Sequence, residues 1–332
     1  MEMINLMTTI KDIARIASVS VATVSRVINE SGYVNADTRK KVEEAIKLMN
    51  YSPNEVARSL YKRKSKLIGL LLPDITNPFF PQLARGVEDR LQEHGYRLIF
   101  GNSDENEDKE LEYIRTFVQN NVIGVISSTN FPDSDTYLKL KIPIVFLDRT
   151  SNESPSVYAD GREGGRIAAQ EIVARGSKHI TILQGPAHIK PAQDRFQGAV
   201  EVLEELGMSY HVIQTSSFSY AEAGHWATIL FEQHLETDGV IASNDIVATA
   251  VLQEAHRLGK LVPQDVQIIG YDDIPLSSLL SPSLSTIRQP AYDMGREAAR
   301  LLIELIEQDK VDETIIQLPV NFVERETTRR KK

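Results

Sequence analysis

The stretch from Thr9 to Asn29 constrains the fold more than any other, because its apolar residues follow two separate helical periods. Apolar side chains spaced three and four residues apart lie on one face of an α-helix. The first series is Ile10, Ile13, Ala14 and Ala17, and the second is Val24, Val27 and Ile28. The interruption from Ser18 to Ser20 predicts a tight turn, and Ser20 is a favourable N-cap for the second helix. The stretch is therefore predicted to form two short helices joined by a turn.

A third amphipathic segment, from Thr38 to Met49, would cover the back of the two short helices. Its apolar face consists of Val42, Ala45, Ile46 and Met49. On the second short helix, Thr23, Ser25 and Arg26 lie on the polar side, from which they can reach phosphates or base edges. The three segments together predict a helix-turn-helix headpiece, although any small three-helix bundle needs a similar apolar pattern.

A short helix candidate and a basic run follow the headpiece. Asn54 to Leu60 reads N-E-V-A-R-S-L behind Pro53, and four basic residues lie between positions 62 and 66. This combination of headpiece, A-R-S-L segment and basic linker resembles the LacI family of bacterial transcription regulators. The resemblance implies that segment 54–60 is a hinge helix that folds only on cognate DNA, where Leu60 enters the minor groove and kinks the duplex. Packing of Leu60 against its own hinge is the simpler alternative.

The resemblance also implies a homodimer whose headpieces bind successive major grooves of a palindromic operator. The residues assigned to DNA contact are Thr9, Ser20, Val21, Ala22, Thr23, Ser25, Arg26, Asn29, Asn54, Ala57, Arg58 and Leu60. Val21 and Ala22 can touch a thymine methyl group but donate no hydrogen bond. The operator sequence therefore stays open.

The charge distribution agrees with a DNA-binding head on a body that avoids DNA. The formal charge is −9, but residues 1–66 carry 12 Lys or Arg against 7 Asp or Glu, which is +5 and leaves −14 for the remainder. Phosphates attract the basic head and repel the acidic body.

The chain has no cysteine, and no apolar run approaches the roughly 18 to 20 residues of a membrane helix. We expect a cytoplasmic protein that is neither exported nor anchored.

From Lys66 onward, short apolar runs alternate with amphipathic segments. The runs at 67–72, 97–100, 122–126 and 144–147 are typical of buried strands, and 81–94 and 107–120 are typical of helices between them. A further helix is expected from Asp293 to Glu307. This alternation predicts a doubly wound parallel sheet.

The α/β pattern occurs twice. K-H-I-T-I-L from Lys178 resembles K-L-I-G-L-L from Lys66, and T-D-G-V-I-A-S from Thr237 resembles N-V-I-G-V-I-S from Asn121. Two copies of one unit predict two lobes with a cleft between them. With the resemblance to periplasmic sugar-binding proteins, the expected fold class is α/β: a three-helix helix-turn-helix headpiece and a hinge helix, then a two-lobed periplasmic-binding-protein-like body with two doubly wound parallel sheets.

The expected boundaries are a disordered leader at 1–7, the helix-turn-helix domain at 8–53, the hinge helix and linker at 54–65, and a ligand-binding and dimerisation domain at 66–332. The first lobe would comprise about 66–161 and 292–320, and the second about 162–291 and 321–332. The chain would cross between lobes near Gly161, Pro290 and Asn321. The C-terminus has no leucine heptad, so a dimer is expected rather than a tetramer.

Polar and aromatic residues follow the predicted strands in both halves. They are Asn77, Phe79, Phe80, Asp148, Arg149, Arg195, Phe218, Asn244, Asp272 and Gln289. Carboxylates, amides and guanidinium groups bind sugar hydroxyls, and aromatic rings cover the C–H faces of sugars. Each residue alone has a simpler reading as a turn, cap, core or surface residue. The set matches the sugar contacts of ribose-binding proteins, and this resemblance implies D-ribose as the effector and a ribose-responsive member of the LacI family in Gram-positive bacteria.

The implied function is repression of ribose uptake and catabolism genes, with ribose closing the lobes and releasing the operator. The residues themselves do not distinguish an inducer from a corepressor. A different sugar, a purine or a phosphoprotein coregulator docking on the first lobe are the alternatives.

An enzyme is the main rival class. However, no G-x-G-x-x-G follows a strand, no G-x-x-x-x-G-K-[ST] occurs, and the seven histidines show neither H-E-x-x-H nor metal-ligand spacing. We therefore predict no catalytic residues, no cofactor and no metal site. A periplasmic sugar carrier would share the body, but it would need an export signal and would have no use for the headpiece.

Overall fold

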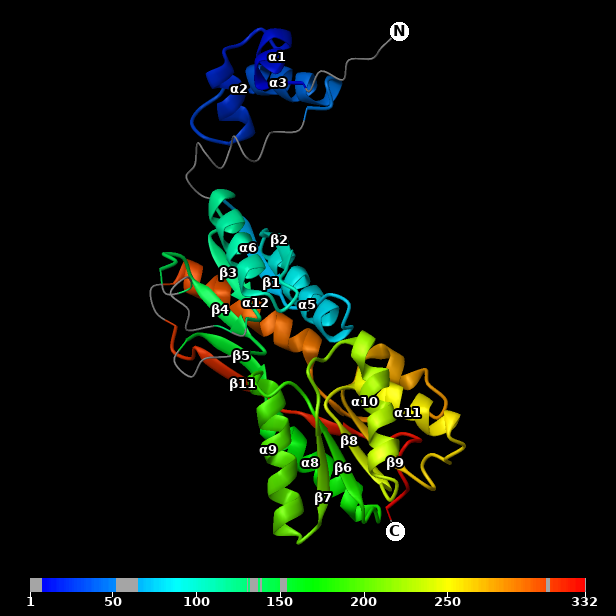
Figure 1. Ribbon diagram of the computed structural model, residues 1–332. Helices are drawn as coiled ribbons and strands as arrows, with labels where there is room; N and C mark the ends of the chain where they lie inside the picture. The colour runs from blue at the N-terminus through cyan, green and yellow to red at the C-terminus, as the bar shows by residue number, and fades with distance from the viewer. Residues whose placement is uncertain are drawn as a thin grey trace. The chain divides into compact units, whose positions relative to one another are not determined.

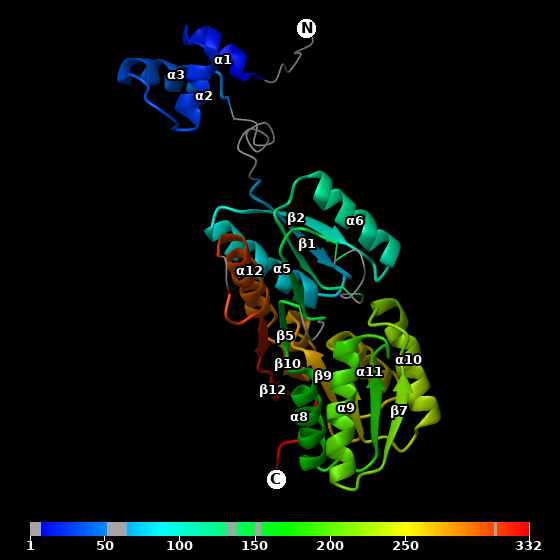
Figure 2. The same cartoon turned by 90° about the vertical axis from the view of Figure 1, so that its left-hand side faces the viewer.

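The structure is a computed structural model that describes residues 8–51, 65–129, 131, 137, 139–149, 154–308 and 311–331. The chain divides into two compact units, Met1–Ser65 and Lys66–Lys332, which we call the headpiece and the body. Figures 1 and 2 show both units from two sides. The leader expected at 1–7 and the hinge segment expected at 54–60 lie outside the described residues.

The headpiece contains three helices, α1 (Ile10–Ile16), α2 (Val21–Ile28) and α3 (Ala36–Leu48). The predicted N-cap of α2 is confirmed, because the Ser20 side chain accepts a hydrogen bond from the Thr23 amide at 3.1 Å. Helix α3 begins two residues earlier than the predicted segment, because the Asn35 side chain accepts a hydrogen bond from the Asp37 amide and caps the helix there.

The three helices of the headpiece share one small core. Each contributes a side chain with no solvent exposure, Ile13 from α1, Val24 from α2 and Val42 from α3. The turn between α1 and α2 is closed by a hydrogen bond from the Val19 amide to the Ala14 carbonyl at 3.0 Å, with Ser18 at a φ of 56°. The predicted helix-turn-helix arrangement is thus present.

The body contains two six-stranded sheets in the part of the chain that is described. The first has the order β11-β5-β4-β3-β1-β2 and is parallel throughout. Its strands are β1 (Leu67–Leu72), β2 (Arg97–Asn102), β3 (Gly124–Ser127), β4 (Ile144–Leu147), β5 (Ser156–Ala159) and β11 (Ile315–Leu318). Strand β3 starts later than predicted, because the Val122 amide donates to the Phe117 carbonyl and closes the preceding helix.

The second sheet repeats the strand order of the first as β12-β10-β9-β8-β6-β7. Its strands are β6 (Ile180–Gln184), β7 (Tyr210–Gln214), β8 (Gly239–Ala242), β9 (Gln267–Asp272), β10 (Ser285–Arg288) and β12 (Asn321–Val323). Only the pairing of β12 with β10 is antiparallel among the strand pairs of the described residues. The internal repeat therefore predicted two copies of one sheet correctly.

Helices cover both faces of each sheet (Figures 1 and 2). In the first lobe, α5 (Phe79–Glu93) and α12 (Ala291–Glu307) cover one face and α6 (Glu107–Gln119) the other. In the second lobe, α8 (Gly161–Ala174) and α9 (Lys190–Glu205) lie opposite α10 (Tyr220–Gln233) and α11 (Asp245–Arg257). Burial on both faces explains why the strands read as continuous apolar runs.

Within the described residues, the backbone passes from one sheet or lobe to the other at three places, each one or two residues long. Asp160 separates β5 from α8, Gln289 and Pro290 separate β10 from α12, and Pro319 and Val320 separate β11 from β12. Such short connections leave few backbone torsions for relative movement of the lobes.

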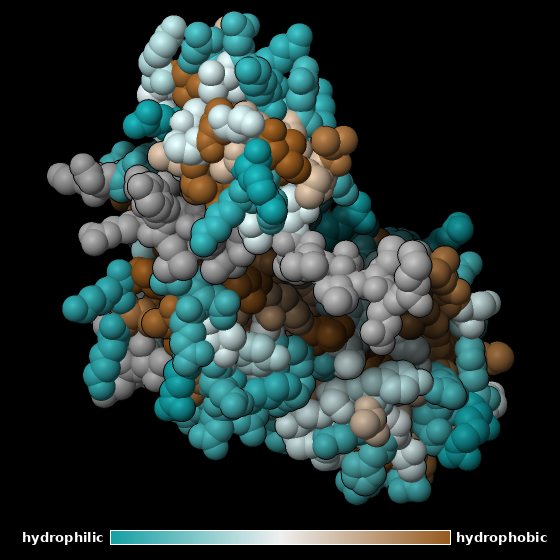
Figure 3. Space-filling view, turned by 90° about the horizontal axis from the view of Figure 1, so that it is seen from above, coloured by the Kyte–Doolittle hydropathy of each residue, from teal (hydrophilic) through white to brown (hydrophobic). Residues whose placement is uncertain are grey.

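The described helices include none that combines the length and the apolar character needed to cross a membrane. On the face of the molecule in Figure 3, hydrophilic residues cover most of the surface and the apolar residues form separate patches.

Helices α5 and α12 approach each other closely enough to require glycine. A Cβ atom added at Gly295 would lie 2.2 Å from the Leu83 carbonyl oxygen and 3.0 Å from the Val87 nitrogen, which are backbone atoms that cannot rotate away. We predict that Gly295→Ala lowers the free energy of unfolding by about 1–3 kcal/mol, the usual cost of overpacking. Urea denaturation would measure the change.

The matched control is Gly224→Ala in α10, where an added Cβ meets no atom within 4 Å. Alanine favours a helix over glycine by roughly 0.5–1 kcal/mol, so this variant should be slightly more stable than the parent chain. Equal stability of the two variants would contradict the close helix contact.

Candidate functional site

The body contains a pocket between its two lobes that gathers most of the predicted sugar-contact residues. The pocket is lined by Asn77, Phe79, Phe80, Asp148, Arg149, Ile189, Pro191, Arg195, Phe218, Asn244 and Asp272. The remaining predicted residue, Gln289, lines an adjoining pocket that also includes Asp148 and Arg195. The structure thus brings all ten predicted residues to one region.

The parallel sheets explain this convergence. Asn77 and Phe79 follow β1, Asp148 follows β4, Asn244 follows β8, and Asp272 is the last residue of β9. Loops after parallel strands all emerge at the carboxyl edge of the sheet, where open α/β folds bind their ligands. Because the two lobes present these edges to the same pocket, residues far apart in the sequence become neighbours.

Arg195 on α9 is held by several contacts at once. Its Nη1 donates to the Ser243 carbonyl at 2.8 Å, its Nη2 lies 3.5 Å from Asp272 Oδ1, and its guanidinium is centred 3.9 Å from the Tyr271 ring. The buried Nε has no hydrogen-bond partner among the described residues. A buried donor without a partner is costly, so a polar ligand at this position would stabilise the pocket.

Two carboxyl groups, the buried Asp272 and the half-buried Asp148, lie at the ends of strands from different lobes. Burial raises the pKa of Asp272 to about 8, against the opposing effect of Arg195, and burial also raises the pKa of Asp148. Gln289 Nε2 donates to Asp272 Oδ1 at 2.8 Å. Both aspartates have a positive φ, 68° at Asp148 and 107° at Asp272, a backbone conformation that is uncommon for a non-glycine residue.

Arg149 is fixed from the first lobe by a two-pronged ion pair. Its two terminal nitrogens each lie 2.6 Å from a carboxylate oxygen of Glu105, and its guanidinium is 5.9 Å from the centre of the Phe80 ring. Sequence reasoning missed Glu105. The same rule that found Asp148 would have found it, because Glu105 lies shortly after the end of β2.

The neighbouring acids Asp272 and Asp273 serve different partners. Asp273 forms ion pairs of 2.6 Å with both Arg288 and Arg325, whereas Asp272 faces Arg195 and Gln289. Adjacent side chains on an extended segment point to opposite sides, which argues against a catalytic carboxylate pair at these positions.

Asn244 acts both as a cap and as a pocket residue. Its Oδ1 accepts a hydrogen bond from the Val247 amide at 2.8 Å, and its Nδ2 lies 3.4 Å from the Phe218 carbonyl oxygen. The simpler reading of Asn244 as a helix cap is therefore correct, and it does not exclude the pocket role. Ile189 and Pro191, which also line the pocket, carried no polar signal that the sequence could have used.

Asp245 supports the backbone of the pocket, although it was not among the ten predicted contact residues. It is fully buried and accepts hydrogen bonds from the Ile274 amide at 2.9 Å, the Ser277 hydroxyl at 2.6 Å and the Thr286 hydroxyl at 2.5 Å. Ile274 and Ser277 belong to the segment that directly follows β9. These bonds hold the backbone that presents Asp272 to the pocket.

The headpiece presents most of its predicted DNA-contact residues on its surface. Thr9, Ser20, Val21, Ala22 and Arg26 are exposed, and Thr23, Ser25 and Asn29 are half-buried. The hydroxyls of Ser20 and Thr23 lie 2.9 Å apart at the start of α2. The predicted hinge contacts Asn54, Ala57, Arg58 and Leu60 lie outside the described residues.

Comparison with known proteins agrees with both units. A family profile described as "Bacterial regulatory proteins, lacI family" matches residues 9–54, and one described as "Periplasmic binding protein-like domain" matches residues 169–328. The chain is 60% identical over 325 residues to a protein of Bacillus subtilis (strain 168) named "Ribose operon repressor", covering 98% of this chain and 100% of that protein. The chain belongs to the LacI family.

Solved structures of the LacI family share this fold. The lac repressor dimer bound to operator and the anti-inducer ONPF matches 97% of this chain and 99% of its own, with a TM-score of 0.89 and 26% identity. A LacI family transcriptional regulator from Enterococcus faecium with bound ribose matches 79% of this chain and 98% of its own, with a TM-score of 0.72 and 30% identity. This LacI-family chain is accordingly a DNA-binding regulator and not an enzyme.

The buried position of Asp245 predicts an unusual pH dependence of stability. Burial raises its pKa from 3.8 to about 6, so between these values the folded chain holds a proton that the unfolded chain has lost. The stability contributed by Asp245 should therefore fall as the pH rises from about 4 to about 6, by about 3 kcal/mol. Urea denaturation across this range would measure the slope.

Asp245→Asn is the matched control, because its amide oxygen can accept from Ile274 and Ser277 while its amine faces the Thr286 hydroxyl oxygen. The difference in stability between parent and variant should follow the predicted slope, whereas other carboxyl groups affect both proteins equally. A difference that stays constant with pH would contradict a neutral Asp245 in the folded chain.

Proposed function

We propose that this LacI-family regulator binds a palindromic operator as a homodimer, represses genes of ribose uptake and catabolism, and releases the operator when D-ribose occupies the pocket between its lobes. The observation that carries the proposal is the gathering of all ten predicted contact residues at the carboxyl edges of both sheets. The name of the Bacillus subtilis relative and the ribose bound to the Enterococcus faecium regulator support the choice of sugar. The proposed place of action is the cytoplasm.

The pocket suits a pentose because it combines charged hydrogen-bonding groups with aromatic rings. Asp272, Arg195 and Arg149 offer acceptors and forked donors for neighbouring hydroxyls. The rings of Phe79 and Phe218 would cover the C–H face of the sugar. A sugar in this position would contact both lobes at once, so its binding energy would favour the closed arrangement of the body.

The headpiece supports the DNA-binding half of the proposal. The exposed start of α2, with Val21 and Ala22 flanked by Ser20 and Arg26, is the part of a helix-turn-helix unit that meets base edges. The net charge of +5 on residues 1–66 attracts the phosphate backbone. We propose that the hinge residues between 54 and 60 complete the interface in the minor groove.

A homodimer would match the two-fold symmetry of a palindromic operator. The second lobe carries exposed apolar side chains that a second copy could cover, among them Leu261, Leu276 and Leu279, which are 61%, 45% and 78% exposed. The structural match to a lac repressor dimer supports the same assembly.

We predict that saturating D-ribose lowers the affinity of the chain for its operator about 5- to 150-fold, the range of typical coupling free energies between two sites. The reason is that the closed, sugar-bound body would hold the paired headpieces in an arrangement that fits the operator less well. Fluorescence anisotropy with a labelled operator at fixed salt would measure the change.

Because coupling is reciprocal, the operator should weaken ribose binding by the same factor. An operator affinity that ribose leaves unchanged or increases would overturn the assignment of ribose as an inducer. A sugar such as xylose in place of ribose is the matched control, and a stronger response to it would favour the alternative of a different sugar effector.

We predict that Arg195→Lys weakens ribose binding about 10-fold or more, because lysine keeps the charge but cannot hold the Ser243 carbonyl and face Asp272 at the same time. Isothermal titration calorimetry with ribose would measure the loss. Arg257→Ala is the control, since Arg257 is exposed on α11 and pairs only with Glu254 on its own helix among the described residues.

Unchanged ribose affinity in Arg195→Lys would remove Arg195 from the proposed contacts.

A phosphoprotein coregulator that docks on the first lobe would be a second effector of operator binding. Adding such a partner protein at constant ribose concentration would then change the operator affinity of the chain.

A further inference from the structure

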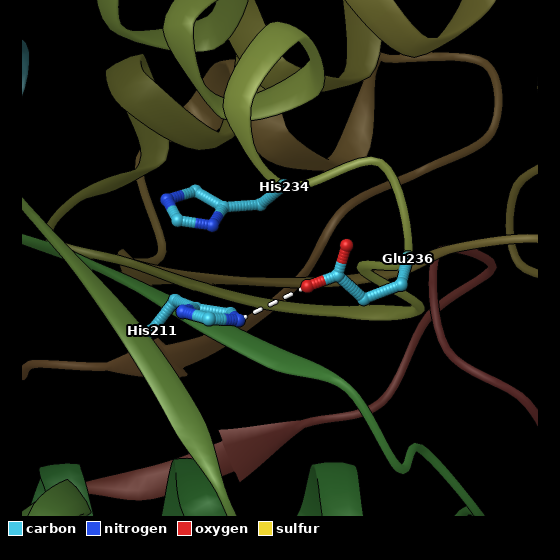
Figure 4. Close-up of side chains that lie close together, drawn as sticks. All are labelled: His211, His234 and Glu236. Atoms are coloured by element: carbon cyan, nitrogen blue, oxygen red, sulfur yellow. Dashed lines mark hydrogen bonds and ion pairs between the residues drawn. The ribbon is translucent and has the colours of Figure 1, made fainter.

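A group of three side chains in the second lobe has the composition of a metal site. His211 lies on β7, His234 caps the end of α10, and Glu236 follows two residues later. Figure 4 shows the two imidazole rings one above the other, with the Glu236 carboxylate beside them. Each of the three residues offers one ligand atom, and these atoms all lie within 4.8 Å of one another.

We propose that His211, His234 and Glu236 bind a divalent transition metal ion of the zinc class. Two imidazole nitrogens and one carboxylate oxygen are a donor set that suits Zn²⁺, with water completing the coordination. Mg²⁺ and Ca²⁺ prefer sites built of oxygen ligands. The proposal is independent of the sugar pocket, since none of the three residues lines it.

One ligand pair already has the spacing that Zn²⁺ requires, whereas the two imidazole rings are stacked at an interplanar angle of 26° and must turn before their nitrogens point to one ion. Metal–ligand distances of about 2.0–2.1 Å in a tetrahedron place the ligand atoms roughly 3.3 Å apart. His211 Nε2 and Glu236 Oε1 already lie 3.0 Å apart, and the two ring centres are 4.3 Å apart. The His211 and Glu236 side chains are each 49% exposed, so modest rotations about their side-chain bonds can bring the remaining ligand atoms together.

The backbone that carries the three ligands is well fixed. The His234 amide donates to the Leu230 carbonyl at 3.0 Å, and the Thr237 amide donates to the His234 carbonyl at 3.1 Å. The buried Thr237 hydroxyl lies 2.7 Å from that of Thr181, and Thr181 pairs with His211 in the register of β6 and β7. The turn with His234 and Glu236 is therefore tied to the strand pair that carries His211.

Bound metal would connect two elements that lead to the sugar pocket. Strand β7 is the last strand at its end of the second sheet. The segment after β7 contains Phe218 and leads into α10, which ends at the proposed ligand His234. A metal ion would thus join the beginning of β7 to the end of α10, at the opposite end of both elements from Phe218.

Zinc binding to the full-length chain, prepared without a polyhistidine tag, tests the proposal. A titration of Zn²⁺ against a chromophoric chelator should give one tightly held ion per chain, and His211→Ala and His234→Gln should each weaken it about tenfold or more. His225→Ala, which removes an exposed histidine from the same helix α10, should bind Zn²⁺ as the parent does. Mg²⁺ should not compete.

Thermal unfolding provides a second readout that also reports folding. Each protein is compared with itself in EDTA, because the ligand variants lose the contacts among these side chains. Added Zn²⁺ should raise the melting temperature of the parent and of His225→Ala, because a ligand that binds only the folded chain stabilises it. The two ligand variants should show little or no rise. The proposal is wrong if Zn²⁺ does not bind to the parent chain, or if His211→Ala and His234→Gln bind it as the parent does.

Discussion

The body depends on charged groups that are buried where its two lobes meet. A buried carboxylate loses its hydration, and only opposite charges and hydrogen bonds can offset that loss. Asp272 has Arg195 and Gln289 as neighbours, and the Arg149 side chain, 4% exposed, has Glu105. The raised pKa values of Asp148 and Asp272 indicate that the protein alone does not fully offset this cost. A polyhydroxylated ligand would supply further hydrogen bonds, so the cost of burying these groups would favour its binding.

The aspartates of the pocket have unusual backbone conformations. Asp148 and Asp272 occupy left-handed conformations that the chain can maintain only if neighbouring bonds over-determine them. Asp245 provides such bonds next to Asp272. It accepts hydrogen bonds from Ile274 and Ser277 in the segment that follows β9, and from Thr286 in β10. The pocket is consequently held in shape before any ligand arrives, which reduces the entropy that binding must overcome.

The sequence predicted the architecture well because architecture depends on local periodicity. The apolar runs at β1 and β4 ended where the strands end, and Ser20 capped α2 as its side-chain chemistry requires. The pocket residues were found because polar residues after parallel strands must converge. Glu105 escaped notice, because an acidic residue in a loop has many ordinary explanations. The hydrogen bonds that Asp245 accepts could be found only in the folded chain.

The histidine cluster shows a different limit of sequence reasoning. No metal spacing was visible, because His234 lies 23 positions after His211 and the contact exists only once β7 and α10 are folded together. A spacing rule detects ligands that share one helix or one loop, such as H-E-x-x-H. Ligands from two elements need the tertiary structure, and for that reason the cluster could be recognised only from the folded chain.

One of the short connections between the lobes contributes a residue to the pocket region. Gln289 lies on the connection from β10 to α12 and at the same time donates to Asp272. A ligand that engages Asp272 would therefore act directly on the backbone about which the lobes can turn. Helix α12 packs closely against α5 at Gly295, where an added Cβ would meet the α5 backbone. The two helices would therefore move together if the backbone at Gln289 shifted. Under the proposed function, rigid packing in the lobes and a ligand contact on their connection would together convert binding into rotation.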